Sequence, residues 1–364
     1  MSWHLQGFDS KEFIQQYWQK KPCLIRQAFV GFQLPISPEE LAGLACEEDV
    51  HSRLVIESGA ETPWKLSYGP FTEDDFLSLP ETHYSLLVSE CEKWIPEFAE
   101  LLDQFHFIPS WRIDDLMVSY APEGGSVGPH SDEYDVFLLQ SYGRRKWQFS
   151  DNRVDNPRLI KGLELAIMQD FKVDQEAILD PGDMLYLPPN VAHHGIAQSC
   201  QNTQGDEIHC MTASVGFRAP SLSTITSDYI HFKNEARKDD SRYRDISPTK
   251  SVHHAEISDK TVDNFVDYLR NELTIDHDEV KQWLGKFCSD NKTFEDFSAK
   301  QLNVDFAEIC QLASRSELIQ SPYSNFLFSH SATASYLFVD GNCYEVSQPF
   351  AVTLCKDSHI NFQQ

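Results

Sequence analysis

Hydrophobic and polar positions follow two different patterns along this chain. Between about residues 111 and 218, short apolar runs are separated by turn signals, and these runs are DDLMVSYA, DVFLLQ, KWQFS, DMLYLP and HCMTASVGF. Short strands divided by Gly- and Pro-rich turns are typical of a barrel or sandwich and not of βαβ units. The pattern therefore predicts a mainly β domain over residues 1–220.

A helix and a strand are predicted ahead of these runs. Asp9 and Ser10 are candidate N-caps and Pro22 stops the helix, whose apolar positions at helical spacing are Phe13, Ile14, Tyr17 and Trp18. The stretch CLIRQAF that follows predicts a strand.

The pattern changes after Pro220. The stretches SLSTITSDYIHFKNEA, SDKTVDNFVDYLRNEL and DEVKQWLGKF carry apolar residues at helical spacing, which predicts a helical region over residues 221–290. From about residue 291 a helical pattern leads into ASYLFVDGNCYEV, where Asp340-Gly341 between apolar runs indicates a hairpin. A helix followed by a hairpin predicts a small α+β, winged-helix-like domain over residues 291–364.

Composition narrows the class of protein. The chain has 364 residues with 41% hydrophobic content, which suffices for one large domain or two to three smaller ones. No charged leader opens it and no run approaches the ~20 apolar residues that span a bilayer, so we expect a soluble, cytoplasmic protein without a membrane partner. The nine cysteines include no Cys-x-x-Cys pair and indicate reduced core residues.

The net charge of the chain indicates which kind of macromolecule it could bind. The formal net charge is −26 and the isoelectric point is near 4.8. Phosphate binding needs clustered Lys and Arg, so this balance argues against direct nucleic-acid binding. Long-range steering favours a basic macromolecular partner instead.

A candidate metal site begins at His130 and Asp132. If this His-x-Asp pair lies on a strand, both side chains project from one face and can converge on one ion. The best donor of a third ligand is DPGDMLYLPPNVAHHG, which supplies His193 or His194, because neighbours on a strand face opposite sides. Two histidines and one carboxylate form the facial triad of non-haem Fe(II) oxygenases.

Strand parity also selects an arginine. In GRRKWQF, Arg145 shares a strand face with Trp147 and Phe149, so it should point into the core. A buried arginine needs an anion, and the distal carboxylate of 2-oxoglutarate could supply one while its keto-acid end chelates iron. The alternative is a protein carboxylate such as Asp115 or Glu133. A serine of LMVSYA, Ser119, is a further candidate donor to the cosubstrate.

The chain resembles the bacterial JmjC-domain ribosomal oxygenases of the cupin superfamily, which hydroxylate an arginine of the large ribosomal subunit. The similar stretches are YWQKKPCLIR, PISPEELAGLA, WRIDDLMVSYAPEGGSVGPHSDEYDVFLLQSYGRRKWQ, PGDMLYLPPNVAHHG and SVGFRAP. They cover most of residues 10 to 220.

The resemblance implies a double-stranded β-helix in which His130, Asp132 and His193 hold Fe(II). It implies that Arg145 and Ser119 hold 2-oxoglutarate, with dioxygen as the second cosubstrate. It also implies a helical dimerisation region, hence a homodimer, and a winged-helix-like C-terminal domain that does not bind DNA.

The substrate hypothesis joins charge and resemblance. Five acids are expected around the mouth of the site: Asp114, Asp115, Glu123, Glu133 and Asp135. They could steer a cationic protein and grip a guanidinium, which predicts hydroxylation of an arginine β-carbon on a large-subunit ribosomal protein, protein sixteen by the resemblance. The alternatives are hydroxylation of a ribosomal histidine, a non-oxidative metal-binding cupin, and a protein that only binds partners.

Overall fold

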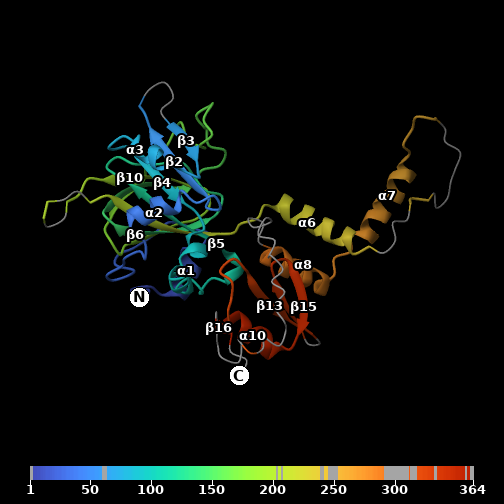
Figure 1. The fold of residues 1–364 in the computed structure, drawn as a ribbon. Helices are drawn as coiled ribbons and strands as arrows, with labels where there is room; N and C mark the ends of the chain where they lie inside the picture. The colour runs from blue at the N-terminus through green and yellow to red at the C-terminus, as the bar shows by residue number, and fades with distance from the viewer. Residues whose placement is uncertain are drawn as a thin grey trace. The chain divides into compact units, whose positions relative to one another are not determined.

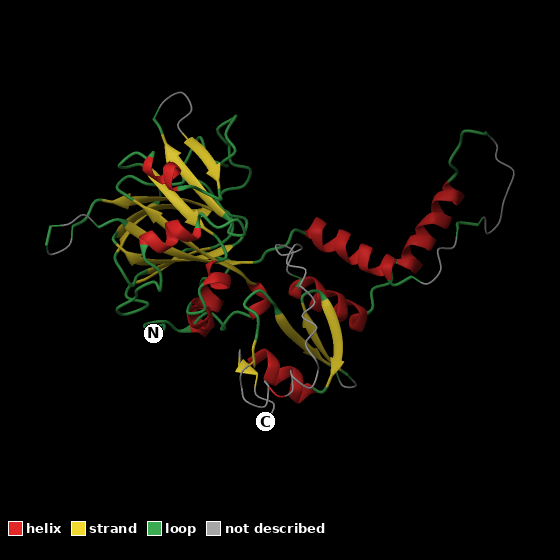
Figure 2. Ribbon diagram, viewed as in Figure 1, coloured by secondary structure: helices red, strands yellow, loops and turns green. Residues whose placement is uncertain are grey.

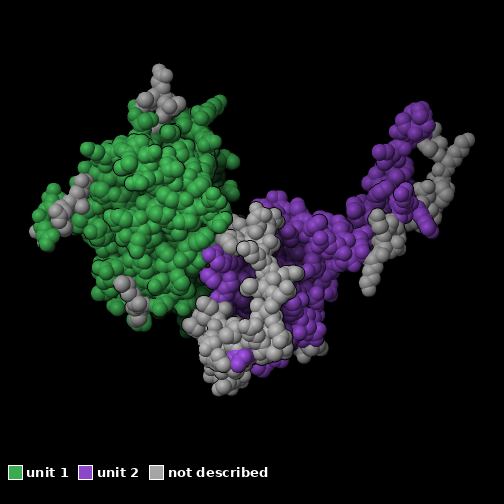
Figure 3. All heavy atoms as spheres, in the orientation of Figure 1, with its two compact units in different colours: residues 1–219 green, residues 220–364 purple. Residues whose placement is uncertain are grey.

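The computed structural model describes residues 3–59, 64–201, 204–205, 208–237, 242–244, 253–290, 311, 318–331, 334–356 and 359–360. The chain divides into two compact units, Met1–Ala219 and Pro220–Gln364 (Figure 3). None of the helices described is long and apolar enough to cross a membrane.

The first unit is dominated by strands (Figures 1 and 2). Its strands are β1 (Cys23–Ile25), β2 (Ser52–Glu57), β3 (Trp64–Tyr68), β4 (Tyr84–Val88), β5 (Ile113–Ala121), β6 (Asp135–Tyr142), β7 (Arg144–Arg153), β8 (Gln175–Leu179), β9 (Met184–Leu187), β10 (Val191–Gln198) and β11 (Cys210–Phe217). Its helices are α1 (Ser10–Gln16), α2 (Pro38–Leu44), α3 (Glu73–Leu77), α4 (Cys91–Trp94) and α5 (Phe98–Asp103), with one 3-10 turn, Ser110–Arg112.

These strands form two antiparallel sheets. The larger has eight strands in the order β1-β9-β6-β11-β5-β4-β2-β3, and the smaller has three in the order β10-β7-β8. Successive residues of β6 show how the large sheet has two buried faces: Val136 and Leu138 join one hydrophobic cluster, whereas Phe137 and Leu139 join another.

The two sheets pack through the first of these clusters. It combines side chains of the large sheet with Trp147 of β7, Leu179 of β8 and Val191 of β10. On its other face the large sheet is covered by aromatic and aliphatic side chains of α1, α2 and α5, among them Phe13, Leu41 and Phe98. This arrangement is the β-rich cupin architecture with additional helices, and side chains of both sheets face each other between them.

The strands predicted between residues 111 and 218 are present as β5, β6, β7, β9 and β11. The sequence pattern missed β8 and β10. Helix α1 begins after Asp9, whose side chain accepts hydrogen bonds from the backbone of Lys11 and Glu12. The strand predicted in CLIRQAF is confined to three residues, because β1 pairs only with the short β9.

The described part of the second unit contains helices and small sheets. The helices are α6 (Leu222–Glu235), α7 (Asp259–Glu272), α8 (His277–Ser289) and the shorter α10 (Gln348–Lys356). The strands are β12 (Leu318–Ile319), β13 (Phe326–His330), β14 (Ser335–Val339), β15 (Asn342–Val346) and β16 (His359–Ile360). Side chains of Ser221, Ser258 and Asp276 cap α6, α7 and α8.

The hairpin predicted at Asp340-Gly341 is present. Val339 pairs with Asn342 across the turn, and both turn residues have positive φ, 47° and 75°. Phe338 of the hairpin packs against α8 at Gly285, where an added Cβ would lie 2.3 Å from the ring. The helical pattern predicted from residue 291 falls outside the described residues.

Candidate metal centre and cosubstrate pocket

The loop between β5 and β6 carries His130 and Asp132. The two residues do not meet the condition of lying on a regular strand, since the loop pairs with β10 through an isolated bridge between His130 and His193. Two backbone hydrogen bonds make this bridge, from His130 N to His193 O at 3.0 Å and from His193 N to His130 O at 2.8 Å. The bridge, not strand parity, brings the residues to one place.

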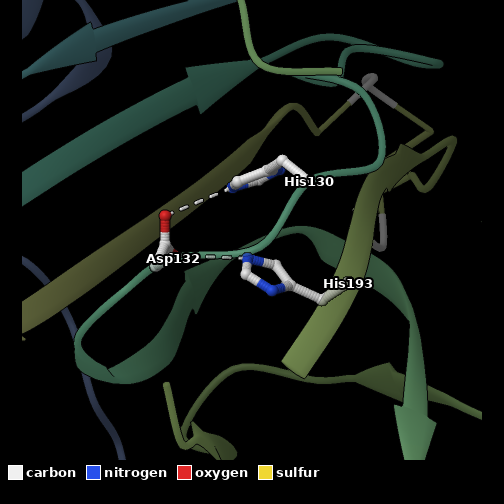
Figure 4. Close-up of side chains that lie close together, drawn as sticks. All are labelled: His130, Asp132 and His193. Atoms are coloured by element: carbon white, nitrogen blue, oxygen red, sulfur yellow. Dashed lines mark ion pairs between the residues drawn. The ribbon is translucent and has the colours of Figure 1, made fainter. Parts of the chain in front are cut away.

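The three side chains converge (Figure 4). Their ligand atoms all lie within 4.8 Å of one another. Asp132 Oδ1 lies 3.9 Å from His130 Nε2, and Asp132 Oδ2 lies 3.5 Å from His193 Nε2. The two imidazole centroids are 4.3 Å apart. One ion could contact all three side chains.

Hydrogen bonds fix how both imidazoles face this point. His130 Nδ1 lies 2.9 Å from Gly128 O, and His193 Nδ1 lies 2.9 Å from Val191 O. Since a carbonyl oxygen only accepts, each Nδ1 must donate, which leaves the Nε2 lone pair for a metal. Gly128 has φ of 80°, a left-handed conformation that glycine adopts readily.

Burial favours the neutral form of His193. Removal from water, and then the nearby His130, lower the pKa of His193 from 6.5 to about 4. The neutral imidazole is the form that binds metals.

His194 points elsewhere. Its ring packs edge-on against Phe171 at 6.2 Å, and it belongs to none of the metal-site clusters among the described residues. The structure therefore brings His130, Asp132 and His193 together and separates His194 from them.

Arg144 and Arg145 lie on opposite faces of β7, as strand parity predicts. Arg144 is exposed and its Nε lies 2.6 Å from Asp180 Oδ1. Arg145 is only 5% exposed, and its Nη2 has no hydrogen-bond partner within the described part of the chain. Neither Asp115 nor Glu133, the alternative partners, forms an ion pair with it in that part of the chain.

Trp147 neighbours both Arg145 and His193. Its ring centroid is 5.8 Å from Arg145 Cζ and 5.9 Å from the His193 ring. The indole Nε1 is also buried without a partner among the described residues. Two buried donors without acceptors on one strand face indicate a polar ligand in this interior.

Ser119 lies in the same interior. It is buried on β5, and its Oγ donates a 3.3 Å hydrogen bond to Thr212 O on β11. Thr212 belongs to a polar group that the sequence pattern did not reveal, with Gln140 of β6 and Cys210 of β11. A sequence signal existed: in CMTASVGF small polar side chains alternate with Met211, Ala213 and Val215.

Two of the five acids expected at the mouth lie elsewhere. Asp135 is fully buried and accepts hydrogen bonds from Tyr186 Oη at 2.6 Å, Gln19 Nε2 at 3.0 Å and Arg112 Nη2 at 3.2 Å. It fastens the segment after α1 to β6 and lines no mouth.

Glu123 is the second acid that lies away from the expected mouth. Phe217 of β11 pairs with both Ile113 and Asp135, so the starts of β5 and β6 lie together. Asp132 comes just before β6 and is therefore near this end. Glu123 follows the opposite end of β5, whereas Asp114 stands beside Ile113.

Two neighbouring carboxyl groups, Asp115 and Glu92, have raised pKa values. Burial and the neighbouring Asp114 raise the pKa of Asp115 to about 6. Burial and Asp115 raise the pKa of Glu92 to about 8, and Glu92 Oε2 accepts a 2.9 Å hydrogen bond from Leu116 N. Perturbed carboxyl groups of this kind often accompany functional sites.

This chain is similar to known proteins and to one protein-family model. The model of the JmjC domain matches residues 100–225. The chain is 36% identical over 281 residues to ribosomal protein uL16 3-hydroxylase of Escherichia coli, covering 77% of this chain and 71% of that protein. It is 41% identical over 214 residues to a probable ribosomal oxygenase of Haemophilus influenzae, covering 58% of this chain and 50% of that protein.

A solved structure extends the comparison to the whole chain. The ribosomal oxygenase YcfD of Escherichia coli, in complex with cobalt and 2-oxoglutarate, superposes with a TM-score of 0.81 at 30% identity and covers 99% of this chain and 92% of that chain. Fold and centre thus define a metal-dependent JmjC domain of the cupin superfamily. The chain belongs to the JmjC-domain ribosomal oxygenases. It is a 2-oxoglutarate-dependent hydroxylase that uses Fe(II), 2-oxoglutarate and dioxygen, and this excludes the non-oxidative cupin.

Proposed function

We propose that this enzyme hydroxylates the β-carbon of an arginine on large-subunit ribosomal protein uL16. The observation that carries the proposal is the His130–Asp132–His193 centre beside the unpartnered Nη2 of Arg145, in a chain whose relative is named for hydroxylation of uL16 at carbon 3. In this proposal the three residues of the centre ligate Fe(II), and Arg145 and Ser119 bind 2-oxoglutarate.

The side chains present suit iron. Two neutral imidazoles and one carboxylate on one side of an ion leave coordination positions free for a keto acid and dioxygen. Sulfur ligands, which would favour a structural zinc site, do not enter the cluster found among the described residues.

The interior also suits 2-oxoglutarate. The pairing of β7 with β10 shows how far Arg145 lies from the metal centre along the strands. Phe149 lies opposite His193, and Arg145 lies opposite Ala197. Four residues of strand separate these pairs, about 13 Å at roughly 3.3 Å per residue, and an arginine side chain with a five-carbon dicarboxylate can span this. The unpartnered Nη2 of Arg145 would meet the distal carboxylate.

The protein's own contribution to the reaction is placement. When bound, iron and 2-oxoglutarate supply the oxidising chemistry that hydroxylates an unactivated carbon. Asp132 and the two imidazoles orient that chemistry toward the start of β5 and β6, Arg145 fixes the cosubstrate, and Trp147 keeps water from the space between them. No side chain has to act as a general base.

Acids near the metal loop would select the substrate. Asp114, Asp115 and Glu133 stand at this end of the first unit, and the net charge of −26 would steer a basic ribosomal protein toward it. A carboxylate can grip the planar guanidinium of arginine at two points, which lysine does not allow. The competing hypothesis is hydroxylation of a histidine, and not an arginine, of a ribosomal protein.

Assembly belongs to the same proposal. We place a JmjC domain at residues 1–220, a helical dimerisation region at 221–290 and a winged-helix-like domain at 291–364, acting in the cytoplasm without direct nucleic-acid contact. Helix α7 supports the dimer, because none of its residues is buried although Val262, Phe265, Val266, Leu269 and Leu273 recur at helical spacing. Apolar stripes of this kind are normally covered.

Peptide turnover tests the substrate assignment. A basic uL16 segment containing the target arginine should drive succinate formation, and the same segment with lysine or histidine at that position should not. Raising salt should slow capture of the arginine peptide far more than it changes the requirement for 2-oxoglutarate. Equal turnover of the histidine peptide would replace the arginine assignment.

A further inference from the structure

Arg145 contacts a cysteine sulfur, that of Cys210, in the buried polar cluster that Cys210 forms with Gln140 and Thr212. We propose that Cys210 is a positioning residue: its sulfur holds the guanidinium of Arg145 through Nε, so that Nη2 stays available for the distal carboxylate of a dicarboxylate cosubstrate. This role of Cys210 rests on the proposed function, because it requires the cosubstrate to reach Arg145.

The contact itself is direct. Arg145 Nε lies 3.3 Å from Cys210 Sγ, and both residues are buried, Cys210 completely. Arginine Nε–H can donate in only one direction, so this contact sets the rotation of the guanidinium plane. Nε is engaged and Nη2 is unpartnered among the described residues, which leaves Nη2 for a carboxylate ligand.

The sulfur is held in place from a second strand. Gln140 Nε2 lies 3.3 Å from Cys210 Sγ, and Gln140 Oε1 accepts a 3.1 Å hydrogen bond from Thr212 Oγ1. Thr212 O in turn accepts from Ser119 Oγ. The chain of contacts therefore runs from Arg145 to Ser119, the two residues proposed to bind 2-oxoglutarate.

A guanidinium prepared in this way should bind its ligand more tightly. The Trp147 ring on one side and the sulfur at Nε restrict the side chain before the cosubstrate arrives. Less rotational freedom is then lost on binding, which is the general advantage of preorganisation. Because the effect acts through Arg145, it should extend only to ligands that reach Arg145.

The competing structural explanation is that Cys210 only fills space. It packs with Ala121 and Ala197 in a small buried cluster, and a thiol there could matter for stability alone. The two explanations differ in ligand specificity, because a filler would affect the protein equally whichever ligand is bound.

The experiment is calorimetric titration of the full chain loaded with Mn(II), which does not require turnover. Each protein is titrated with 2-oxoglutarate and with oxalate, a chelator without a distal carboxylate. We expect Cys210→Ala to weaken 2-oxoglutarate binding by about ten- to a hundred-fold, the range for one hydrogen bond to a charged group, and to leave oxalate binding unchanged. Cys210→Ser, which keeps an acceptor, should recover most of the affinity.

The matched control is Cys91→Ala, which removes a completely buried thiol from the helix-covered core on the other face of the large sheet. It should change neither affinity. Equal losses for 2-oxoglutarate and oxalate in Cys210→Ala, or no loss for either, would overturn the role of Cys210. If Cys210→Ala does not fold, the same comparison is made with Cys210→Ser, and equal losses of 2-oxoglutarate and oxalate binding in that protein would overturn the role as well.

Arg145→Ala separates the role of Cys210 from the function on which it rests. If Arg145→Ala loses 2-oxoglutarate binding and Cys210→Ala does not, only the positioning role fails. If Arg145→Ala binds 2-oxoglutarate as well as the unchanged protein does, the proposed cosubstrate site itself fails.

Discussion

Arg144 and Arg145 are neighbours on β7, but only Arg144 has a carboxylate partner among the described residues, Asp180 Oδ1 at 2.6 Å from its Nε. Arg145→Ala should raise the 2-oxoglutarate concentration needed for half-maximal turnover tens- to thousands-fold, since losing a charged contact in a dry pocket costs about 2–5 kcal/mol. Arg144→Ala should do little, because exposed ion pairs contribute about 0–1 kcal/mol. Steady-state kinetics of both variants measure this, and equal effects would contradict it.

The metal centre gives a second prediction. Asp132→Ala should abolish turnover and Mn(II) binding while the fold remains, because Asp132 belongs to neither large hydrophobic cluster. His193→Ala should behave in the same way, whereas His194→Ala should keep the metal, since its ring lies against Phe171. Metal content after gel filtration distinguishes them. Activity that survives in His193→Ala and disappears in His194→Ala would reverse the assignment.

The raised pKa of Glu92 predicts a pH-dependent stability. The folded protein holds this proton up to about pH 8, whereas the ordinary pKa is 4.5, so the folded state binds more protons between these pH values. Its stability should therefore fall as pH rises through this window. Glu92→Gln stays neutral, keeps an acceptor for Leu116 N, and should flatten the profile.

Denaturant unfolding at pH values near each end of this window measures the effect. Glu97→Gln, an exposed glutamate before α5, is the matched control and should leave the profile unchanged. A Glu92→Gln profile as steep as that of the unchanged protein would show that Glu92 is ionised in the folded state.

The apolar stripe of α7 predicts a homodimer. Phe265→Glu with Leu269→Glu should produce a monomer, because two charges would face a second copy, and Asn271→Glu on the same helix should not. Sedimentation at micromolar concentration measures this. A monomeric unchanged protein at that concentration would exclude the dimer.

Residues on regular strands are predictable, because strand parity depends on local sequence alone. Arg145 illustrates this: its alternation with Trp147 and Phe149 places it inside, as found. The hairpin at Asp340-Gly341 is equally local.

Features that depend on distant partners are not predictable in this way. Asp135 resembles a rim acid in the sequence because its partners Tyr186 and Gln19 lie 51 and 116 residues away. The loop of His130 resembles a strand although its pairing is an isolated bridge to His193. Cys210 gains its significance from Arg145, 65 residues before it.

Mass spectrometry of large-subunit ribosomal proteins is the decisive test of 2-oxoglutarate-dependent arginine hydroxylation on uL16. The proteins are incubated with the enzyme, Fe(II), 2-oxoglutarate and oxygen, alongside Asp132→Ala as the inactive control. We predict a gain of one oxygen on one arginine of uL16, at its β-carbon, only with the unchanged enzyme and only when 2-oxoglutarate is present. A gain on a histidine, a gain on another protein, or no gain on uL16 would contradict this assignment.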